Sequence, residues 1–540
     1  MLETGTLAEP EFFSVSSGLR NAAARTPDAP ALLGETPLSW GALQGRAARV
    51  AARLQALGIQ PGARMAIWTP KGHDFITAIY GALEAGLAYV PLDPMQPSER
   101  AARILDQARP EVLVVSPDLL DHLPGVMPDS VRLVLFTDCD GAAALPVLPV
   151  PALRLSDLPE SVHLPFVAKP HHIAAVLFTS GSTGTPKGVQ MSYGNLAAFV
   201  GWAVAEYGLH GGDVIANHAS FHFDLSTFDL FAAAQVGAAV WSIPTPDQSN
   251  VLAIAEGLAQ HRVTTLYAVP SILAMLTRAG LIDADRLPHL RHVLFAGEVF
   301  AIGDLRALAA RLPEGCTLSN LYGPTETNAC TWHRVTPADL ERDVPVPIGR
   351  PLPGQRAQIL DPETRAPVPP GEKGELVIEG SMVTPGYINP PDEASQANHA
   401  ARRHATGDIV SLRDGALVYH GRIDRIVKVQ GNRVELGEIE AALSRHPLVR
   451  QAAVVQILGP RGADLVAFVA PDGVEAPAVL DLLHFLRTLV PQYMLPRHVR
   501  FIPDLPRTPN GKADLQHLRR MAEDQFLRAP LSRARRPETA

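Results

Sequence analysis

The sequence predicts an α/β protein with a large N-terminal domain of layered α/β subdomains and a small, mobile C-terminal α+β domain. Up to about residue 345, short apolar segments typical of buried strands alternate with helix-like stretches, which favours stacked helices and sheets. Residues 348–423 are rich in Gly and Pro and contain short alternating segments, so they predict a small β-rich subdomain. The 540 residues also exceed what one hydrophobic core usually serves.

The first predicted helix covers residues 41–57. Its apolar residues Leu43, Ala47, Val50 and Leu54 recur at spacings of three or four, and Gly58 marks its end. A buried strand is expected directly afterwards at 65–68. Further buried strands are predicted at residues 111–115, 132–136, 174–178, 264–269 and 292–296.

The small domain is predicted to begin near Asp424. Residues 374–379 alternate as a strand of the β-rich subdomain does, and the segment 421–440 ends in an amphipathic helix. A compact α+β pattern then continues to about residue 526. We therefore expect domains at 1–423 and 424–526, followed by a disordered, Arg- and Pro-rich tail at 527–540.

Composition excludes several classes of partner. With 47 basic and 55 acidic side chains the net charge is −8, and no basic tract is present, so we expect no nucleic acid partner. The longest apolar stretch, 230–241, is too short to cross a bilayer and the N-terminus is acidic, so we expect no membrane partner. Cys139, Cys316 and Cys330 show no metal or disulfide spacing, which favours a cytoplasmic protein.

A loop suited to phosphate lies between a predicted strand, 173–178, and a predicted helix, 195–204. Its glycines let backbone N–H groups face an anion, its hydroxyls donate to phosphate oxygens, and Lys187 supplies charge. It is not a P-loop, because that motif needs lysine directly after glycine, whereas Lys187 lies between Pro186 and Gly188. A flexible linker is the alternative for this segment taken alone.

Two further segments favour a nucleotide site. In 320–326 (NLYGPTE), Tyr322 offers an aromatic face for a base, Thr325 a hydroxyl and Glu326 a hard oxygen ligand for Mg²⁺. In 406–408 (TGD), the Asp408 carboxylate is a plausible acceptor for two ribose hydroxyls. Taken singly, each segment is also compatible with a surface turn.

Together these segments resemble the ordered motifs of adenylate-forming enzymes, and specifically an amino-acid adenylation domain of nonribosomal peptide synthesis. The same set includes 83–94 (LEAGLAYVPLDP), 421–440 (GRIDRIVKVQGNRVELGEIE) and 506–514 (PRTPNGKAD). The resemblance covers about residues 12–520. It implies that ATP and an amino acid give an aminoacyl-adenylate and pyrophosphate, after which the acyl group passes to the phosphopantetheine thiol of a peptidyl carrier protein.

The resemblance also implies roles for single residues. Lys512 bridges the substrate carboxylate and the α-phosphate, Arg422 reaches ribose or phosphate, and Asp424 is the hinge about which the small domain rotates. That rotation would withdraw Lys512 and bring residues 431–433 to the site. The implied catalytic residues are Lys512, Thr325 and Glu326, with Glu326 on Mg²⁺. The implied ATP-binding residues are Thr179, Ser180, Gly181, Ser182, Thr183, Gly184, Lys187, Asn320, Tyr322, Gly323, Asp408 and Arg422.

The segment 221–231 (FHFDLSTFDLF) matches the motif that supplies a carboxylate to the substrate amine. Asp224 stands in an apolar run, and a buried carboxylate needs a cation, which a substrate ammonium provides. Asp229 is the less favoured alternative, and we expect His222 to be structural. The family pattern places the pocket at Asp224, Leu225, Phe228, Tyr267, Leu294, Ala296, Leu321, Ala329, Cys330 and Lys512.

This pocket resembles that of free-standing prolyl ligases and departs from it at Phe228 and Ala329. With one anion and an otherwise apolar or weakly polar lining, it suits L-proline, which is compact, apolar and cationic. Another small or β-amino acid stays open, because one methylene is worth only about 1–3 kcal/mol in such a pocket. An acyl-CoA synthetase for a non-amino acid would leave Asp224 unpaired, and an inactive homologue is disfavoured by intact Lys512, Glu326 and Asp408. No carrier attachment segment follows Lys512, so we expect the carrier protein to act in trans.

Overall fold

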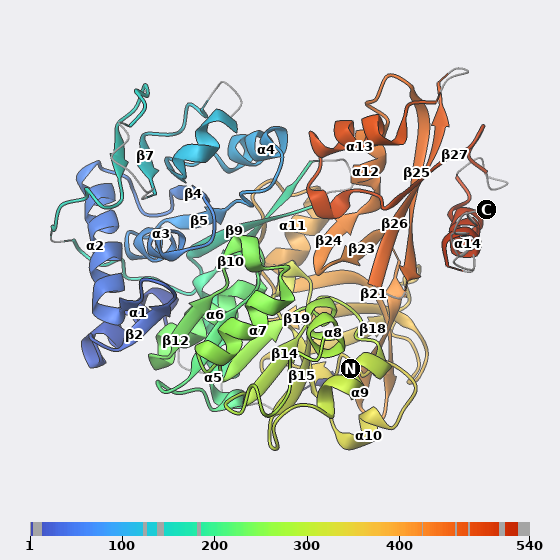
Figure 1. Cartoon of the computed structure of the whole chain (residues 1–540), viewed down its shortest axis with the longest axis horizontal. Helices are drawn as coiled ribbons and strands as arrows, with labels where there is room; N and C mark the ends of the chain where they lie inside the picture. Colours follow the sequence, from blue (N-terminus) through green and yellow to red (C-terminus); the bar gives the residue numbers. More distant parts are fainter. Residues whose placement is uncertain are drawn as a thin grey trace, which may run out of the picture. The chain divides into compact units, whose positions relative to one another are not determined.

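The computed structural model describes residues 2–3, 13–122, 127–137, 145–161, 163–180, 185–423, 425–459, 462–472, 476–506 and 513–527. The chain divides into two compact units (Figure 1). One comprises Met1–Thr179 with Pro186–Asp424, and the other Ser180–Thr185 with Arg425–Ala540. No described helix has the length and apolar character needed to cross a membrane.

An eight-stranded sheet forms the first layer of the first unit. Its strands run parallel apart from β10, which pairs antiparallel with both β9 and the edge strand β20. The order is β20 (Gly386–Tyr387), β10 (Lys187–Ser192), β9 (Ile173–Thr179), β5 (Ala88–Pro91), β4 (Arg64–Trp68), β6 (Val112–Val115), β7 (Leu133–Phe136) and β8 (Ala152–Arg154).

A nine-stranded sheet forms the second layer. Its six central strands, from β15 to β2, are parallel, and antiparallel strands close both edges. The order is β17 (Arg350–Pro351), β16 (Thr331–Arg334), β15 (Thr317–Tyr322), β14 (His292–Phe295), β13 (Thr265–Ala268), β11 (Val214–Asn217), β12 (Ala239–Ser242), β2 (Pro30–Leu33) and β3 (Leu38–Ser39).

Helices pack between the two sheets and on their outer faces. Side-chain alternation shows this on β6, where Val112 and Val114 join the central apolar cluster while Leu113 and Val115 join the outer one. The central helices are α1 (Val15–Arg25), α2 (Trp40–Ala56), α3 (His73–Glu84), α5 (Tyr193–Tyr207) and α6 (Leu225–Val236). Helix α4 (Ser98–Ala108) covers the first sheet, and α7 (Val251–Gln260), α8 (Pro270–Arg278) and α9 (Ile302–Ala309) cover the second. The short α10 (Pro337–Leu340) follows β16.

The β-rich subdomain is an antiparallel sheet. Its order is β1 (Leu2–Glu3), β18 (Gln355–Leu360), β19 (Gly374–Gly380), β21 (Arg403–Arg413) and β22 (Ala416–Arg422). It also carries a helix that the sequence did not predict, α11 (Glu393–Ala400). Asp392 caps this helix by accepting the Ser395 N–H at 2.6 Å, but only His399 within it is buried, so no apolar stripe marked it.

The second unit has two small sheets and three longer helices. Strands β23 (Ile426–Val429) and β24 (Asn432–Glu435) form a hairpin, and β25 (Val449–Gly459), β26 (Gly462–Pro471) and β27 (His498–Phe501) form a three-stranded sheet. Helices α12 (Leu436–Leu443) and α13 (Val479–Arg487) pack on one face of that sheet, and α14 (Leu515–Phe526) packs on the other (Figure 1). Along β25, Val454 faces α12 while Val455 faces α14, as a period of two requires.

The predicted α/β class is confirmed, and most elements begin and end within two residues of their predicted bounds. The largest difference is α5, predicted at 195–204 and observed at Tyr193–Tyr207. Asn195 is the third residue of this helix, where its side chain completes a capping box with Ser192. Cys316 and Cys330 form no disulfide within the described part of the chain. Cys139 and the predicted tail from residue 528 lie outside the described residues.

Candidate active site

The carboxyl ends of β13, β14 and β15 bring three predicted pocket residues together. Tyr267 and Leu294 are register partners near the ends of β13 and β14, and Leu321 lies near the end of β15. Ala296 follows β14 by one residue. Because neighbouring parallel strands end at one edge of a sheet, residues far apart in sequence meet there, which is where α/β proteins usually bind ligands.

Helix α6 contributes a further predicted pocket residue to the same apolar cluster. Phe228 has no exposed surface, and its ring lies edge-on to the Tyr267 ring with centroids 5.6 Å apart. Ala329 joins the same apolar cluster, and Leu225 packs at its margin. Cys330 does not join it and packs in the cluster of the β-rich subdomain, with its thiol 3.5 Å from the Tyr322 carbonyl oxygen.

The two aspartates of the α6 segment have different surroundings. Asp224 directly precedes the helix and is half-buried, whereas Asp229 has no exposed surface. Burial raises the pKa of Asp229, although a 2.8 Å hydrogen bond from the Asn217 amide and the nearby Lys71 ammonium oppose that rise. Burial raises the pKa of Tyr267 too, and the charges of Asp224 and Asp229 both add to that rise.

Hydrogen bonds connect the TGD segment (406–408) to the NLYGPTE segment (320–326) and to β22. The Tyr322 hydroxyl donates to one oxygen of Asp408, and Arg422 donates to the other at 2.7 Å. Asp408 and Arg422 are register partners on β21 and β22, which fixes the ion pair on a rigid sheet. Burial, followed by the Asp408 charge, raises the pKa of the Tyr322 hydroxyl, so it stays protonated and donates.

The turn after β15 carries Glu326, Thr325 and Gly323. Glu326 is fully buried in a short 3₁₀ helix, η3 (Thr325–Thr327), and its Oε1 accepts from the Tyr387 hydroxyl at 2.6 Å. Thr325 is half-buried at the start of the same turn. Gly323 allows the turn to close, because a Cβ there would lie 1.6 Å from the Asn328 carbonyl oxygen. The Asn320 amide has a structural bond, since it donates to the Pro347 carbonyl at 2.9 Å.

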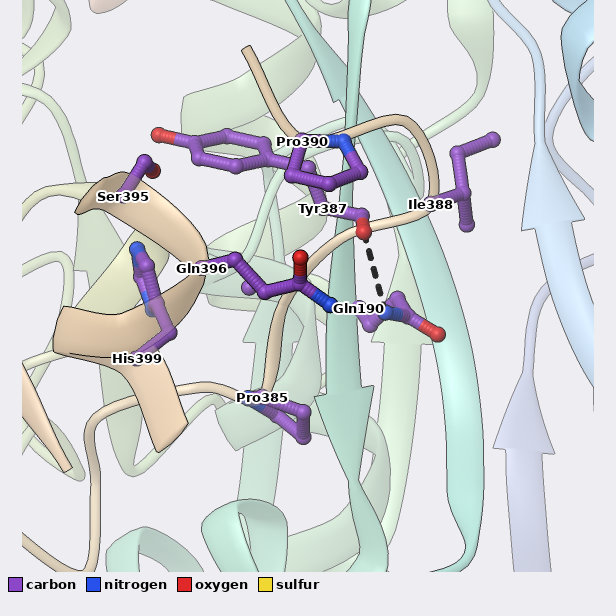
Figure 2. A pocket seen from close by; sticks show the side chains of 9 residues that line it. Gln190, Pro385, Tyr387, Ile388, Pro390, Ser395, Gln396 and His399 are labelled. Carbon is purple, nitrogen blue, oxygen red and sulfur yellow. Dashed lines mark hydrogen bonds between the residues drawn. The ribbon is translucent and has the colours of Figure 1, made fainter. Parts of the chain in front are cut away.

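Tyr387 also lines a hollow of about 260 Å³ beside β10 and α11. Figure 2 shows the Gln190 amide donating to the Tyr387 carbonyl oxygen, a bond of 3.2 Å. Strand β20 is thereby tied to β10 through a side chain as well as the ladder. The backbone that presents the Tyr387 hydroxyl to Glu326 is therefore fixed.

Only the edges of the phosphate loop are described. Thr179 ends β9 opposite Lys187 at the start of β10, and the buried Thr179 hydroxyl has no hydrogen-bond partner among the described residues. Ser180 groups with the second unit, where its hydroxyl donates to the Arg433 carbonyl at 2.8 Å. Six predicted residues lie outside the described residues: Gly181, Ser182, Thr183, Gly184, Asp424 and Lys512.

Several residues of this region escaped the sequence interpretation. Lys71 and Asn217 form the polar cluster around Asp229, Tyr387 holds Glu326, and Asn328 donates to the Thr227 hydroxyl at 3.3 Å. None belongs to a predicted motif, although Asn328 lies two residues after the end of 320–326. An Asn in an apolar strand such as β11 was the clearest available signal, because a buried amide needs partners.

The side chains of Thr179 and Glu326 suit a nucleoside triphosphate with its Mg²⁺ better than a metal ion bound by protein ligands alone. Within the described part of the chain, no cluster of three or more His, Cys, Asp or Glu side chains could hold a metal ion. Mg²⁺ commonly binds through one or two carboxylates together with substrate phosphates and waters, so a single buried Glu326 beside a phosphate loop is compatible with it. The partnerless Thr179 hydroxyl equally suits a phosphate oxygen.

The chain thus folds into two units, and in the first unit an apolar cluster at the carboxyl ends of parallel strands adjoins a segment with one half-buried carboxylate, Asp224. The chain belongs to the AMP-binding enzyme family, whose model matches residues 19–388, while the model of the AMP-binding enzyme C-terminal domain matches residues 438–512. This confirms the resemblance to adenylate-forming enzymes found in the sequence, and ATP is the substrate that such enzymes use.

Similar proteins include two with the same name. The L-proline--[L-prolyl-carrier protein] ligase of Streptomyces coelicolor is 45% identical over 92% of this chain and 95% of its own length. Its namesake from Pseudomonas fluorescens is 37% identical over 93% of this chain and 97% of its own length. Among solved structures, the amide bond synthetase McbA from Marinactinospora thermotolerans superposes with a TM-score of 0.81 at 26% identity, covering 94% of this chain and 99% of that one.

Proposed function

We propose that this protein activates L-proline with ATP to form prolyl-adenylate and pyrophosphate, and then loads the prolyl group onto the phosphopantetheine thiol of a separate peptidyl carrier protein. The observation that carries this proposal is the half-buried Asp224 beside the apolar cluster of Phe228, Tyr267 and Leu294. Proline offers one cation and a compact apolar ring to such a pocket. The two relatives named as prolyl ligases cover nearly the whole chain and support the same substrate.

In the first step, an oxygen of the proline carboxylate attacks the α-phosphorus of ATP. The bond from that phosphorus to the bridging oxygen breaks, and pyrophosphate leaves with the electron pair. In the second step, the carrier thiolate attacks the acyl carbon and AMP leaves. The protein's contribution to the first step is positioning and charge stabilisation, because both reactants are anions that repel each other.

The proposed roles follow the surroundings of each residue. Asp224 holds the secondary ammonium, while the ring lies against the apolar cluster. The Tyr322–Asp408–Arg422 group binds the ribose, since a carboxylate that already accepts two bonds still has lone pairs for hydroxyls. We assign the other pocket, phosphate-loop and turn residues the roles named from the sequence, with Lys512 stabilising the transferring phosphate. The exceptions are Cys330, which packs in another cluster, and Asn320, whose amide donates to Pro347.

Mg²⁺, when bound, supplies charge neutralisation on the phosphates, and Glu326 is the residue proposed to hold it. Asp424 is proposed as the hinge between domains at 1–423 and 424–526, and of the predicted tail at 527–540 only Leu527 is among the described residues. We place the protein in the cytoplasm, because its three cysteines show no disulfide pattern.

Amino-acid-dependent exchange of pyrophosphate into ATP tests this function. The panel contains L-proline, alanine, valine, pipecolate, β-alanine and cyclopentanecarboxylate, which has the proline ring shape without the amine. Proline is expected to give the highest kcat/KM. Higher exchange with another amino acid would overturn the proline assignment, and exchange with cyclopentanecarboxylate equal to that with proline would favour a non-amino acid substrate.

A further inference from the structure

Lys71 binds the backbone at the end of β11, near the pocket but outside the predicted motifs. Its ammonium donates to three successive carbonyl oxygens, those of Asn217 at 2.9 Å, His218 at 3.2 Å and Ala219 at 3.1 Å. Lys71 follows β4 of the eight-stranded sheet, whereas β11 belongs to the nine-stranded sheet. One side chain therefore links the two sheets where the chain leaves β11.

The three acceptors indicate that Lys71 is charged. A neutral amine has two N–H donors and an ammonium has three, so three carbonyl acceptors match the ammonium. Burial lowers the pKa of Lys71, and the Asp229 carboxylate opposes that shift. The Phe221 ring adds a favourable contact, since the ammonium lies 5.3 Å from its centroid.

The stretch 217–229 begins at the end of β11 and is closed by a hydrogen bond between its first and last residues, Asn217 and Asp229. The Asn217 amide donates to Asp229 Oδ2 at 2.8 Å and also to the Ala219 carbonyl at 3.0 Å, while its oxygen accepts from the Ser242 hydroxyl at 3.2 Å. Residues 217 and 229 are the two ends of one stretch of chain, so this bond ties the stretch into a loop. Asp224 lies in its middle, at the start of α6.

A second set of bonds fixes the first half of this loop. The Gln248 amide donates to the His218 carbonyl at 2.8 Å, and His218 Nε2 lies 2.9 Å from the Gln248 carbonyl. Burial lowers the pKa of His218 to about 4, so its ring is neutral at pH 7 and donates this bond. The Ser220 hydroxyl bonds the Gln248 side chain as well. The path from β11 toward Asp224 is thus held at each residue from 217 to 220.

We propose that Lys71, Asn217 and Asp229 form a positioning cluster that fixes the Asp224 carboxylate for the substrate amine. The inference rests on the proposed function, because it needs Asp224 to bind that amine. None of the three residues touches the substrate in this proposal. They act by holding both ends of the 217–229 loop, so that binding proline does not require the loop to be ordered first.

The test separates amine binding from nucleotide binding. Lys71→Met keeps the length of the side chain and removes its donors and charge. We expect KM for proline to rise by about 10- to 100-fold, the size of effect that small misplacements cause, with KM for ATP within about twofold of wild type. Arg64→Met is the matched control, because Arg64 begins β4, the strand that precedes Lys71. Its side chain also donates to a backbone carbonyl, that of Ala108 at 2.7 Å. The Arg64→Met substitution should leave both KM values unchanged.

A double-mutant cycle with Asp224→Ala tests the route of the effect. If Lys71 acts through Asp224, adding Lys71→Met to Asp224→Ala should change kcat/KM for proline by less than about threefold. Multiplicative effects would overturn the proposal. Should Lys71→Met fail to fold, Asp229→Asn serves instead, since it keeps the shape of the side chain, and it should raise KM for proline selectively.

Assays of the wild-type protein in parallel show whether a failure concerns the proposed function or only the positioning cluster. If wild type shows no proline-dependent exchange, the proposed function fails before the cluster is tested. If wild type activates proline while Lys71→Met and Asp229→Asn keep its KM for proline, or raise the KM values for proline and ATP together, the positioning cluster is wrong and the function stands.

Discussion

At the scale of single residues, the two aspartates of the α6 segment show how surroundings assign a role. Sequence pattern favoured Asp224 for the amine and left Asp229 as an alternative. In the structure Asp229 is fully buried and already accepts a bond from Asn217, with Lys71 as a neighbouring cation. A substrate ammonium there would add a second cation to a carboxylate that is partly compensated. This supports Asp224, and the choice stays a prediction until it is tested.

Asp224→Ala should remove most of the discrimination for an amine. Loss of one partner of a buried ion pair costs about 3–5 kcal/mol, so kcat/KM for proline in the exchange assay should fall by roughly two to four orders of magnitude. Asp392→Ala is the matched control, because Asp392 also precedes a helix but is exposed. The Asp392→Ala substitution should lower the free energy of unfolding by only about 1 kcal/mol and leave proline activation intact. An Asp224→Ala enzyme with unchanged proline selectivity would move the amine site elsewhere.

Tyr387→Phe should weaken the use of Mg²⁺ without removing activity. The hydroxyl donates to the buried Glu326 carboxylate at 2.6 Å, and losing a bond to a buried charged group costs about 1.5–3 kcal/mol. We expect the Mg²⁺ concentration for half-maximal exchange to rise severalfold or more. The control is Tyr80→Phe, which removes a hydroxyl bonded to a neutral carbonyl, that of Leu230 at 3.0 Å. Equal Mg²⁺ dependence in wild type and Tyr387→Phe would show that Glu326 does not bind the metal.

At the scale of elements, strands and long helices were predictable because their side chains repeat with a clear period. Strand β6 is apolar at each of its four positions, as a strand buried on both faces must be. Helix α11 was missed because it buries one residue, and α5 began earlier than predicted because its cap precedes the apolar run. Periodicity reports burial, so elements that bury little leave little signal.

Gly323→Ala tests the turn that carries Glu326. The added Cβ would lie 1.6 Å from the Asn328 carbonyl oxygen, so the turn must open or shift. We expect a loss of at least about 1–3 kcal/mol in unfolding free energy and a drop in exchange activity, because Glu326 moves with the turn. Gly303→Ala is the control, since that glycine lies in α9 with open space around it, and alanine there should stabilise the helix by up to about 1 kcal/mol. Thermal unfolding and exchange of both variants decide the matter.

At the scale of the whole molecule, the site is assembled from segments that the sequence keeps far apart. The pocket is a prediction from family motifs, whereas the cluster of Lys71, Asn217 and Asp229 could not be predicted, because Lys71 and Asn217 are 146 positions apart and neither has a local pattern. Long-range hydrogen bonds between a side chain and backbone carbonyls depend on how the sheets stack. Local pattern therefore predicts which residues react, while the fold shows which contacts hold the described ones in place.

Lys512→Ala should separate the two half-reactions. Two cations of the first unit have protein acceptors, since Lys71 holds three carbonyls and Arg422 holds Asp408. The resemblance to adenylate-forming enzymes implies that Lys512 stabilises charge on the transferring phosphate, and losing one such stabilising group costs about 10²–10³ in rate. Exchange should fall by at least that factor. Transfer from supplied prolyl-adenylate to a phosphopantetheinylated carrier protein should stay within a fewfold of wild type, because thioester formation no longer needs charge at the α-phosphorus. Equal losses in both assays would mean that Lys512 serves both steps or the stability of its domain, which a melting curve of the variant would separate.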